Sequence, residues 1–256
     1  MKKRREFKFL VKREFVPKIA EFLSQNFTLS THSDGILFSY KNDYFDTDDY
    51  VFFNKHRCGK PNRLKVRVRK YESGDKKNFM EFKQKIKGVF TEKERFEISE
   101  KTEEILIFDN EKTLKILEKF RIKKEEISRK ITTTYKRIFL VSKDLKTRIT
   151  FDLDLSAQFK NGKKVELFQE YFIMEIKDLN TPKNIMQFLK KNFKIRQTNF
   201  SKYCISLCAL NQDFKSNKWK QILKLNTEDT GYSKFFLRLR SYLFLFRFFP
   251  FLQTIN

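Results

Sequence analysis

The stretch NRLKVRVRKY, residues 62–71, alternates basic and apolar side chains. Successive side chains of an extended strand point to opposite faces. One face of this stretch is therefore apolar, with Leu64, Val66 and Val68. The other face carries Lys65, Arg67, Arg69 and Tyr71. This pattern predicts a strand that packs on one side and presents a row of cations on the other.

Other stretches alternate in the same way, and the chain of 256 residues is 40% apolar, enough to bury a sizeable core. Helical periodicity separates several of the alternating stretches. Strands are predicted near residues 5–12, 36–41, 63–71, 78–87, 93–98, 133–141, 147–155 and 170–178. Helices are predicted near residues 16–26, 46–55, 111–120, 182–192 and 199–210.

The predicted helices need the apolar face of the sheet to pack on, which leaves the charged face for the inside. We therefore expect an α+β fold built on a closed antiparallel β-barrel of about eight strands, with helices outside and cations in the lumen. An ordinary antiparallel sheet with one solvated face is the alternative. Arginine recurs on these faces, and its rigid donor fork suits phosphate, which favours the barrel.

Charge is the strongest feature of the composition. Lysine and arginine number 56 against 32 acidic residues, a net charge of +24. Such a chain predicts a polyanionic partner, although lysine-rich decoration of an ordinary surface is an alternative. No glycine-rich phosphate loop, helix-turn-helix, zinc finger or RNA-binding aromatic pair is present in the sequence. Sequence-specific nucleic-acid binding is therefore not expected.

The cysteines and histidines show no metal-binding pattern. Cys58 stands alone, while Cys204 and Cys208 lie one helical turn apart and are predicted to be core residues. His32 and His56 are not spaced with them as zinc ligands. The basic start of the chain is interrupted by charged residues, unlike a signal peptide. We expect a cytoplasmic protein.

Composition divides the chain into three parts. Residues 1–210 form the predicted tunnel domain, residues 211–230 a polar linker, and residues 231–256 a basic, aromatic tail. On a helix, residues 233–250 would be amphipathic, with phenylalanine and leucine opposite arginine. The tail is predicted either to lie peripherally on an anionic membrane surface or to fold back onto the barrel.

The charged strand faces also carry carboxylates. Glu6, Glu81, Asp152 and Glu175 share faces with lysine or arginine. Oxygen ligands of this kind suit Mg²⁺ or Mn²⁺, which could bridge phosphate oxygens. The alternative is that each acid is a salt-bridge partner of the neighbouring cations.

Nine motifs in order resemble the VTC domain, the polyphosphate polymerase domain of the vacuolar transporter chaperone complex, which also has stand-alone bacterial relatives. That domain is a member of the CYTH-like triphosphate tunnel metalloenzymes. The resemblance covers about residues 3–208. It rests on RREFKFLV (4–11), YFDT (44–47), NRLKVRVRKY (62–71), FMEFKQK (79–85), KERF (93–96), YKRIFL (135–140), RITFDLDL (148–155), IMEIK (173–177) and FSKY (200–203).

The resemblance implies an eight-stranded tunnel that binds ATP and polyphosphate with Mn²⁺ or Mg²⁺. It implies phosphate ligands at Lys8, Arg67, Arg69, Lys83, Lys93, Arg137, Arg148 and Lys202. Tyr71 and Tyr135 match aromatic positions of the family. Catalysis would fall to Arg67, Arg69, Lys83, Arg137 and Arg148. Glu175 is the implied metal ligand, with Glu6 and Asp152 as further candidates.

The expected function is therefore an ATP-dependent polyphosphate polymerase. Two alternatives stay open: a tunnel-type triphosphatase, and a polyanion-binding protein without turnover. The hydrolytic tunnel enzymes begin with a paired ExExK motif, whereas this chain supplies only Glu6 before Lys8. That departure favours the polymerase. The fungal complexes also carry a phosphate-sensing domain and membrane helices that this sequence lacks.

Overall fold

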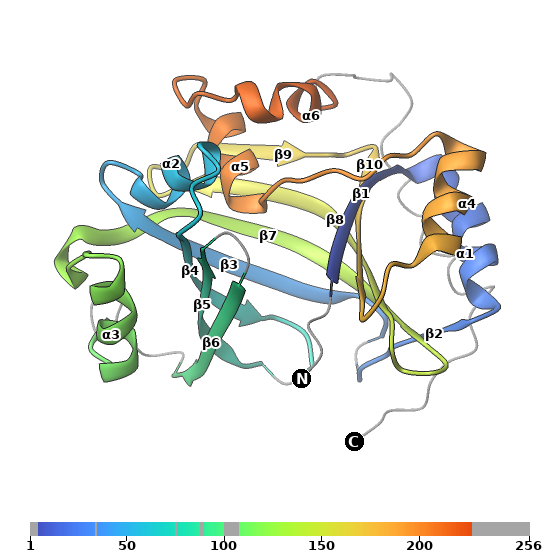
Figure 1. Cartoon of the computed structure of the whole chain (residues 1–256), viewed down its shortest axis with the longest axis horizontal. Helices are drawn as coiled ribbons and strands as arrows, with labels where there is room; N and C mark the ends of the chain where they lie inside the picture. Colours follow the sequence, from blue (N-terminus) through green and yellow to red (C-terminus); the bar gives the residue numbers. More distant parts are fainter. Residues whose placement is uncertain (1–4, 34, 75, 88–89, 100–107, 227–256) are drawn as a thin grey trace.

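The computed structural model describes residues 5–33, 35–74, 76–87, 90–99 and 108–226 (Figure 1). The strands are β1 (Arg5–Lys12), β2 (Phe27–Leu29), β3 (Phe38–Thr47), β4 (Arg63–Tyr71), β5 (Asn78–Ile86), β6 (Phe90–Ile98), β7 (Ile127–Ser142), β8 (Arg148–Phe159), β9 (Lys164–Leu167) and β10 (Tyr171–Asp178). The α-helices are α1 (Val16–Ser24), α2 (Val51–Arg57), α3 (Glu111–Lys119), α4 (Lys183–Phe193), α5 (Lys202–Leu210) and α6 (Lys220–Lys224).

All the strands join one antiparallel sheet. Eight of them follow the order β1-β10-β8-β7-β3-β4-β5-β6, while β2 pairs with β7 and β9 pairs with β8. The register places charged residues opposite one another: Lys8 faces Glu175, and Arg67 faces Glu81. The prediction of an α+β fold on a large antiparallel sheet is confirmed.

Closure of this sheet into a barrel is the part of the prediction that was wrong. In the described residues, no backbone pairing joins the two end strands, β1 and β6. The free edge of β1 instead meets the chain after α4, where the backbone N–H of Thr198 donates to the Lys8 carbonyl at 2.7 Å. Across the seam, Lys83 of β5 and Glu6 of β1 form an ion pair at 3.5 Å. Side chains therefore bridge the gap that backbone hydrogen bonds leave open.

Helices cover the outer, apolar face of the sheet in two places. Helices α1 and α4 lie side by side at one end (Figure 1), where the rings of Phe22 and Phe188 stack at 3.9 Å. Their apolar faces pack with Phe9 and Met174 of the sheet. At the other end, α3 covers the apolar face of β4 and β5, including Val66. Burial of these faces, worth about 1.5–3 kcal/mol per large side chain, accounts for the strict alternation of the strands.

Helix α5 is different, because it packs among inward-facing side chains. Tyr203 stacks on Tyr44 of β3 with ring centroids 5.2 Å apart, and it shares a buried cluster with Tyr135 and Ile173. Cys204 and Cys208 of this helix are buried, as predicted from their spacing. The expectation that every helix lies outside the sheet is therefore wrong for α5, whose first residues reach the concave side.

Several element boundaries differ from the predictions; β3, for example, ends at Thr47 and not near residue 41. The predicted helix at 46–55 begins only at Val51, because the Asp46 carboxylate ends β3 and accepts backbone N–H groups of Thr47, Phe52 and Phe53. The short strands β2 and β9 were not predicted. Within the predicted linker, Trp219 is buried in the cluster around α5. The predicted membrane-binding tail, residues 231–256, lies outside the described residues, and no described helix could span a bilayer.

Candidate functional site

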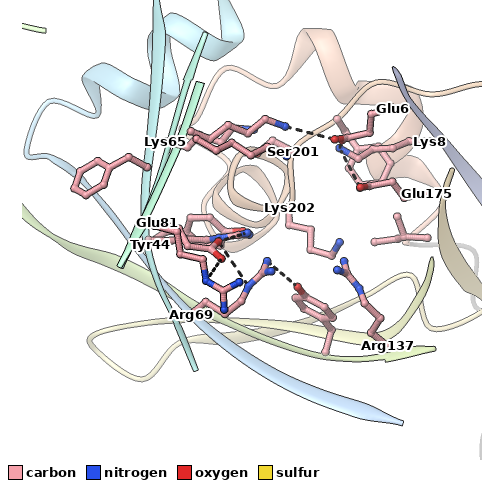
Figure 2. A pocket seen from close by; sticks show the side chains of 18 of the residues that line it. Glu6, Lys8, Tyr44, Lys65, Arg69, Glu81, Arg137, Glu175, Ser201 and Lys202 are labelled. Carbon is pink, nitrogen blue, oxygen red and sulfur yellow. Dashed lines mark hydrogen bonds and ion pairs between the residues drawn. The ribbon is translucent and has the colours of Figure 1, made fainter. Parts of the chain in front are cut away.

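A charged cavity of about 310 Å³ lies on the concave side of the sheet (Figure 2). Its walls come from β1, β3, β4, β5, β6, β7, β10 and the start of α5. Ten lining residues are basic: Lys8, Lys65, Arg67, Arg69, Lys83, Lys93, Arg95, Arg137, Lys177 and Lys202. Four are acidic: Glu6, Glu81, Glu94 and Glu175. The excess of cations makes this cavity suited to a multivalent anion.

Glu81 organises the arginines of one wall. Its carboxylate accepts from Arg67 Nη2 at 2.6 Å and lies 3.8 Å from Arg69 Nε and from Arg95 Nε. Burial would raise the pKa of Glu81, but Arg67 and Arg69 lower it overall. The carboxylate is thus ionised and holds three guanidinium groups close together, with donors left over for another anion.

Asp152 plays the same part for the opposite wall. Both of its oxygens accept from Arg137, and Lys202 also donates to it. The carboxylate of Asp152 is fully buried, and although burial alone would raise its pKa, Arg137 and Lys202 lower it to about 2. Arg137 of β7 and Lys202 of α5 are therefore fixed to one buried charge, although they come from distant parts of the chain.

The end of the cavity at β1 and β10 carries a third charged group. Lys8 Nζ lies 2.6 Å from Glu6 and 3.7 Å from Glu175, and Lys177 lies 2.5 Å from Glu175. Burial and Glu175 would both raise the pKa of Glu6, but Lys8 and Lys83 lower it to about 2. Burial would likewise raise the pKa of Glu175, yet Lys177, Lys8 and Arg137 hold it well below its ordinary value.

Tyrosine hydroxyls line the floor beside these cations. Arg69 Nη2 donates to the Tyr135 hydroxyl at 3.4 Å, and Lys202 Nζ sits 4.7 Å from the Tyr135 ring. Burial would raise the pKa of Tyr135, but Arg69 and Arg137 lower it overall. Tyr44 accepts from Arg67 at 3.3 Å. The phenols thus help to hold the guanidinium groups in place.

Two lysines of the cavity make no ion pair with any residue in the described ranges, Lys65 and Lys93. Burial lowers the pKa of Lys65 to about 7, and the nearby cations Lys83 and Lys8 act in the same direction. A buried amine next to other cations is stabilised in its charged form by an anion. An anion in the cavity therefore favours the charged form of Lys65.

The cavity contains most of the residues singled out in the sequence. The structure brings together Lys8, Arg67, Arg69, Lys83, Lys93, Tyr135, Arg137, Lys202, Glu6 and Glu175. It places three others elsewhere. Tyr71 accepts from Arg95 outside the cavity lining, Arg148 is exposed at the start of β8, and Asp152 is buried behind Arg137.

The candidate set from the sequence lacked several lining residues. Lys65 and Lys177 lie on the alternating charged faces and could have been included from that pattern alone. Arg95 is two residues from Lys93 on β6, so the same argument applies to it. Tyr44 and Ser201 carry no such signal, because tyrosine and serine at these positions are compatible with an ordinary sheet and helix cap.

Glu6 and Glu175 are the candidate ligands for a divalent cation in this cavity. Among the described residues there is no cluster of three or more aspartate, glutamate, histidine or cysteine side chains that could hold a metal by themselves. Glu6 and Glu175, however, both contact Lys8, so two carboxylates converge there. Mg²⁺ and similar ions often use one or two carboxylates together with phosphate oxygens and water. The oxygens of Asp152 are occupied by Arg137 and Lys202, and Asp152 lies outside the cavity lining. A cation at Glu6 and Glu175 would likewise have to displace lysine contacts.

Comparisons with known proteins identify the family of this chain and relate its fold to solved structures. The family model of the VTC domain matches residues 3–211. A proposed adenylate cyclase from Bacillus halodurans is similar in structure, with a TM-score of 0.53 and 16% identity over 78% of this chain and 94% of that chain. A proposed adenylyl cyclase from Hippeastrum, described as having a dominant triphosphatase activity, has a TM-score of 0.49 and 11% identity over 80% and 95% of the two chains. No curated protein matches the sequence.

Proposed function

The chain belongs to the VTC-domain family, and from this premise we propose that it is a polyphosphate polymerase that uses ATP. The observation that carries the proposal is the row of cations held around a charged cavity by Glu81 and Asp152. Phosphoryl transfer depends mainly on positioning and on stabilising charge, and it needs no nucleophilic side chain. The proposed substrates are ATP and the growing inorganic chain.

In the proposed reaction, the terminal oxygen of the chain attacks the γ-phosphorus of ATP. The bond from that phosphorus to the bridging oxygen breaks, ADP leaves, and the chain is one phosphate longer. Arg67, Arg69 and Arg137 are proposed to hold the oxygens of the transferred group, with Lys202 beside them. Lys8, Lys83 and Lys93 would hold the neighbouring phosphates.

Glu175 and Glu6 are proposed to hold Mn²⁺ or Mg²⁺ together with phosphate oxygens. A bound divalent ion would neutralise charge on the phosphate oxygens. The lysines and arginines of the protein are proposed to orient the reactants whether or not a metal ion is bound. Arg148 begins β8 and lies opposite Lys177 in the register. It is proposed to contact the polyphosphate chain outside the cavity.

Hydrolysis is the second candidate function. The open seam between β1 and β6 favours it, because water could enter where the described residues form no backbone pairing between these two strands. In that reaction water replaces the chain end as the nucleophile, and free phosphate leaves.

Incubation of the purified protein with ATP and Mn²⁺ tests these functions together. We expect a long phosphate polymer and ADP in matched amounts. Free phosphate without polymer would assign the chain as a triphosphatase, and binding without either product would leave a polyanion-binding protein. Duplex DNA should bind weakly, with a strong salt dependence and no sequence preference.

A further inference from the structure

A group of cations extends beyond one end of the cavity, and among the described residues only its member Lys83 forms an ion pair with an acidic side chain. We name this group the end cluster. It consists of His56, Arg63, Lys65, Lys83, Lys85 and Lys218. Lys65 and Lys83 also line the cavity, so the cluster is continuous with the cavity through them.

Sheet register creates the cluster. Arg63 of β4 lies directly opposite Lys85 of β5, and Lys65 lies opposite Lys83. These two positions share one face, so two successive cross-strand pairs consist of like charges. Such pairs destabilise a sheet unless something else compensates for the charge. In the neighbouring pair, Arg67 lies opposite Glu81 and the charges are opposite.

Helix α2 and the turn before α6 add to the same region. Lys218 Nζ donates to the His56 carbonyl at 3.1 Å, which places a further cation beside the imidazole. Burial together with Lys65, Arg63 and Lys218 lowers the pKa of His56 to about 2. His56 therefore has cations on several sides, contributed by separate elements of the fold.

Buried nitrogen atoms in this cluster have no hydrogen-bond partner. They are His56 Nε2 and Arg63 Nε. The Arg63 Nε–H is a buried donor left without an acceptor, which is unfavourable, so this group calls for an acceptor such as an anion. Within the described residues, Arg63, Lys65, Lys85 and Lys218 form no ion pair, and Lys83 reaches only Glu6.

We infer that the end cluster is a second anion subsite, which binds phosphate groups of a chain too long to fit within the cavity. Arg63 to Arg69 spans about 20 Å of strand, at roughly 3.3 Å per residue. A triphosphate, with three phosphorus atoms joined by two oxygens, is shorter than this row. Only a longer chain can contact Arg69 in the cavity and Arg63 in the outer part of the end cluster at once. The subsite thus gives the protein a preference for long chains over triphosphate.

This inference rests on the proposed phosphate-binding role of the cavity. It does not depend on whether the protein makes or hydrolyses polyphosphate. Its test is the ratio of two dissociation constants, for tripolyphosphate and for a long-chain inorganic polyphosphate, measured by titration calorimetry at physiological ionic strength. The test variant is Arg63→Gln with Lys218→Gln. The control is Lys190→Gln with Arg196→Gln, which removes the same charges from the exposed surface at α4.

In the test variant, we expect the loss of affinity for the long chain to be at least about tenfold greater than the loss for tripolyphosphate. The reason is that the variant lacks two charge-assisted hydrogen bonds that only the long chain can form. The control should change both affinities by the same small factor. Equal losses for both ligands in the test variant would overturn the inference. If the unmodified protein binds neither ligand, the inference and the phosphate-binding role both fail. If it binds them but makes no polymer, only the proposed polymerase fails.

A second measurement uses the unmodified protein. His32 and His56 are the only histidines of the sequence, so their ring protons are readily assigned by proton NMR with a His32→Gln variant. Long-chain polyphosphate should shift the His56 resonance towards its protonated position, while tripolyphosphate shifts it much less. An unchanged His56 resonance at saturation with the long chain would contradict the subsite.

Discussion

Both carboxylate oxygens of Asp152 accept hydrogen bonds from the guanidinium of Arg137, with Oδ2 2.7 Å from Nη2. Since Asp152 is on β8 and Arg137 on β7, this pair ties two strands of the wall together. Lys202 joins the same carboxylate from α5. One buried acid thus sets the position of two cations that are proposed to bind phosphate.

Removing the charge of Asp152 should destabilise the protein. Asp152→Asn leaves Arg137 and Lys202 without their shared counterion, and breaking a buried pair in this way costs about 3–5 kcal/mol. Denaturation in urea should show this loss. A long phosphate chain should restore part of the stability, because it supplies negative charge to the same cations. If the variant is as stable as the unmodified protein, Asp152 does not position them.

The stability that Asp152 contributes also depends on pH. Its pKa is about 2 in the folded protein, below the value of about 3.9 for an unfolded aspartate. A lowered pKa means that this contribution is complete above about pH 4 and is lost as the pH falls through about 2. The stability of Asp152→Asn should lack this dependence on pH between about 4 and 2. Acid denaturation of the variant and of the unmodified protein, measured side by side, would show the difference.

Arg67 and Arg69 should be essential for polymer synthesis. Each is two residues from the other on β4, and both contact Glu81. Arg67→Ala or Arg69→Ala should lower the rate of polymer formation by about 100-fold or more, as for other lost electrostatic contacts in a transition state. Circular dichroism should show an intact fold. Rates equal to those of the unmodified protein in both variants would exclude these arginines from the reaction.

Glu175→Gln should separate phosphate binding from metal dependence. The substitution keeps the shape of the side chain and removes the charge that a hard cation requires. We expect binding of a phosphate chain to persist and Mn²⁺-dependent turnover to fall strongly. Calorimetric titration with Mn²⁺ in the presence of polyphosphate is the measurement. Unchanged metal affinity would make Glu175 only a partner of Lys8 and Lys177.

Lys65 should link chain binding to proton uptake. Its pKa of about 7 is well below the value of about 10.4 for an unfolded lysine. Bound phosphate favours the charged amine, so affinity for the chain should fall as the pH rises from about 7 to about 9. Lys65→Arg is always charged and should show a weaker dependence. Calorimetry in buffers of different ionisation enthalpy counts the protons taken up.

The end cluster should lower stability when no anion is present. In phosphate-free buffer, Arg63→Gln removes one like-charge pair, worth about 0.2–1 kcal/mol. The melting temperature should therefore rise by about 1–3 °C. With long-chain polyphosphate present, the unmodified protein should have a higher melting temperature than the variant. A variant that melts lower in both conditions would indicate that Arg63 has a structural role instead.

Strict alternation made the strands predictable, and β4 was assigned with its observed bounds, residues 63–71. The same alternation identified Arg67, Arg69 and Glu175 as inward-facing. The open seam of the sheet was not predictable, because the edge of β1 is taken by Thr198, which is far from Lys8 in the sequence. The placement of Asp152 was not predictable either. The spacing of residues along a strand gives the face on which a side chain lies but not the partners that surround it.

The pairing of β1 with β10 joins residues that are separated by most of the domain, with Arg5 opposite Asp178. At a synthesis rate of about 5–20 residues per second, the first strand waits roughly 10–30 s for its partner to be made. Glu6 and Lys8 enter the site only with that pairing. The cavity therefore lacks one of its walls until β10 has been synthesised, whatever the order in which the earlier strands fold.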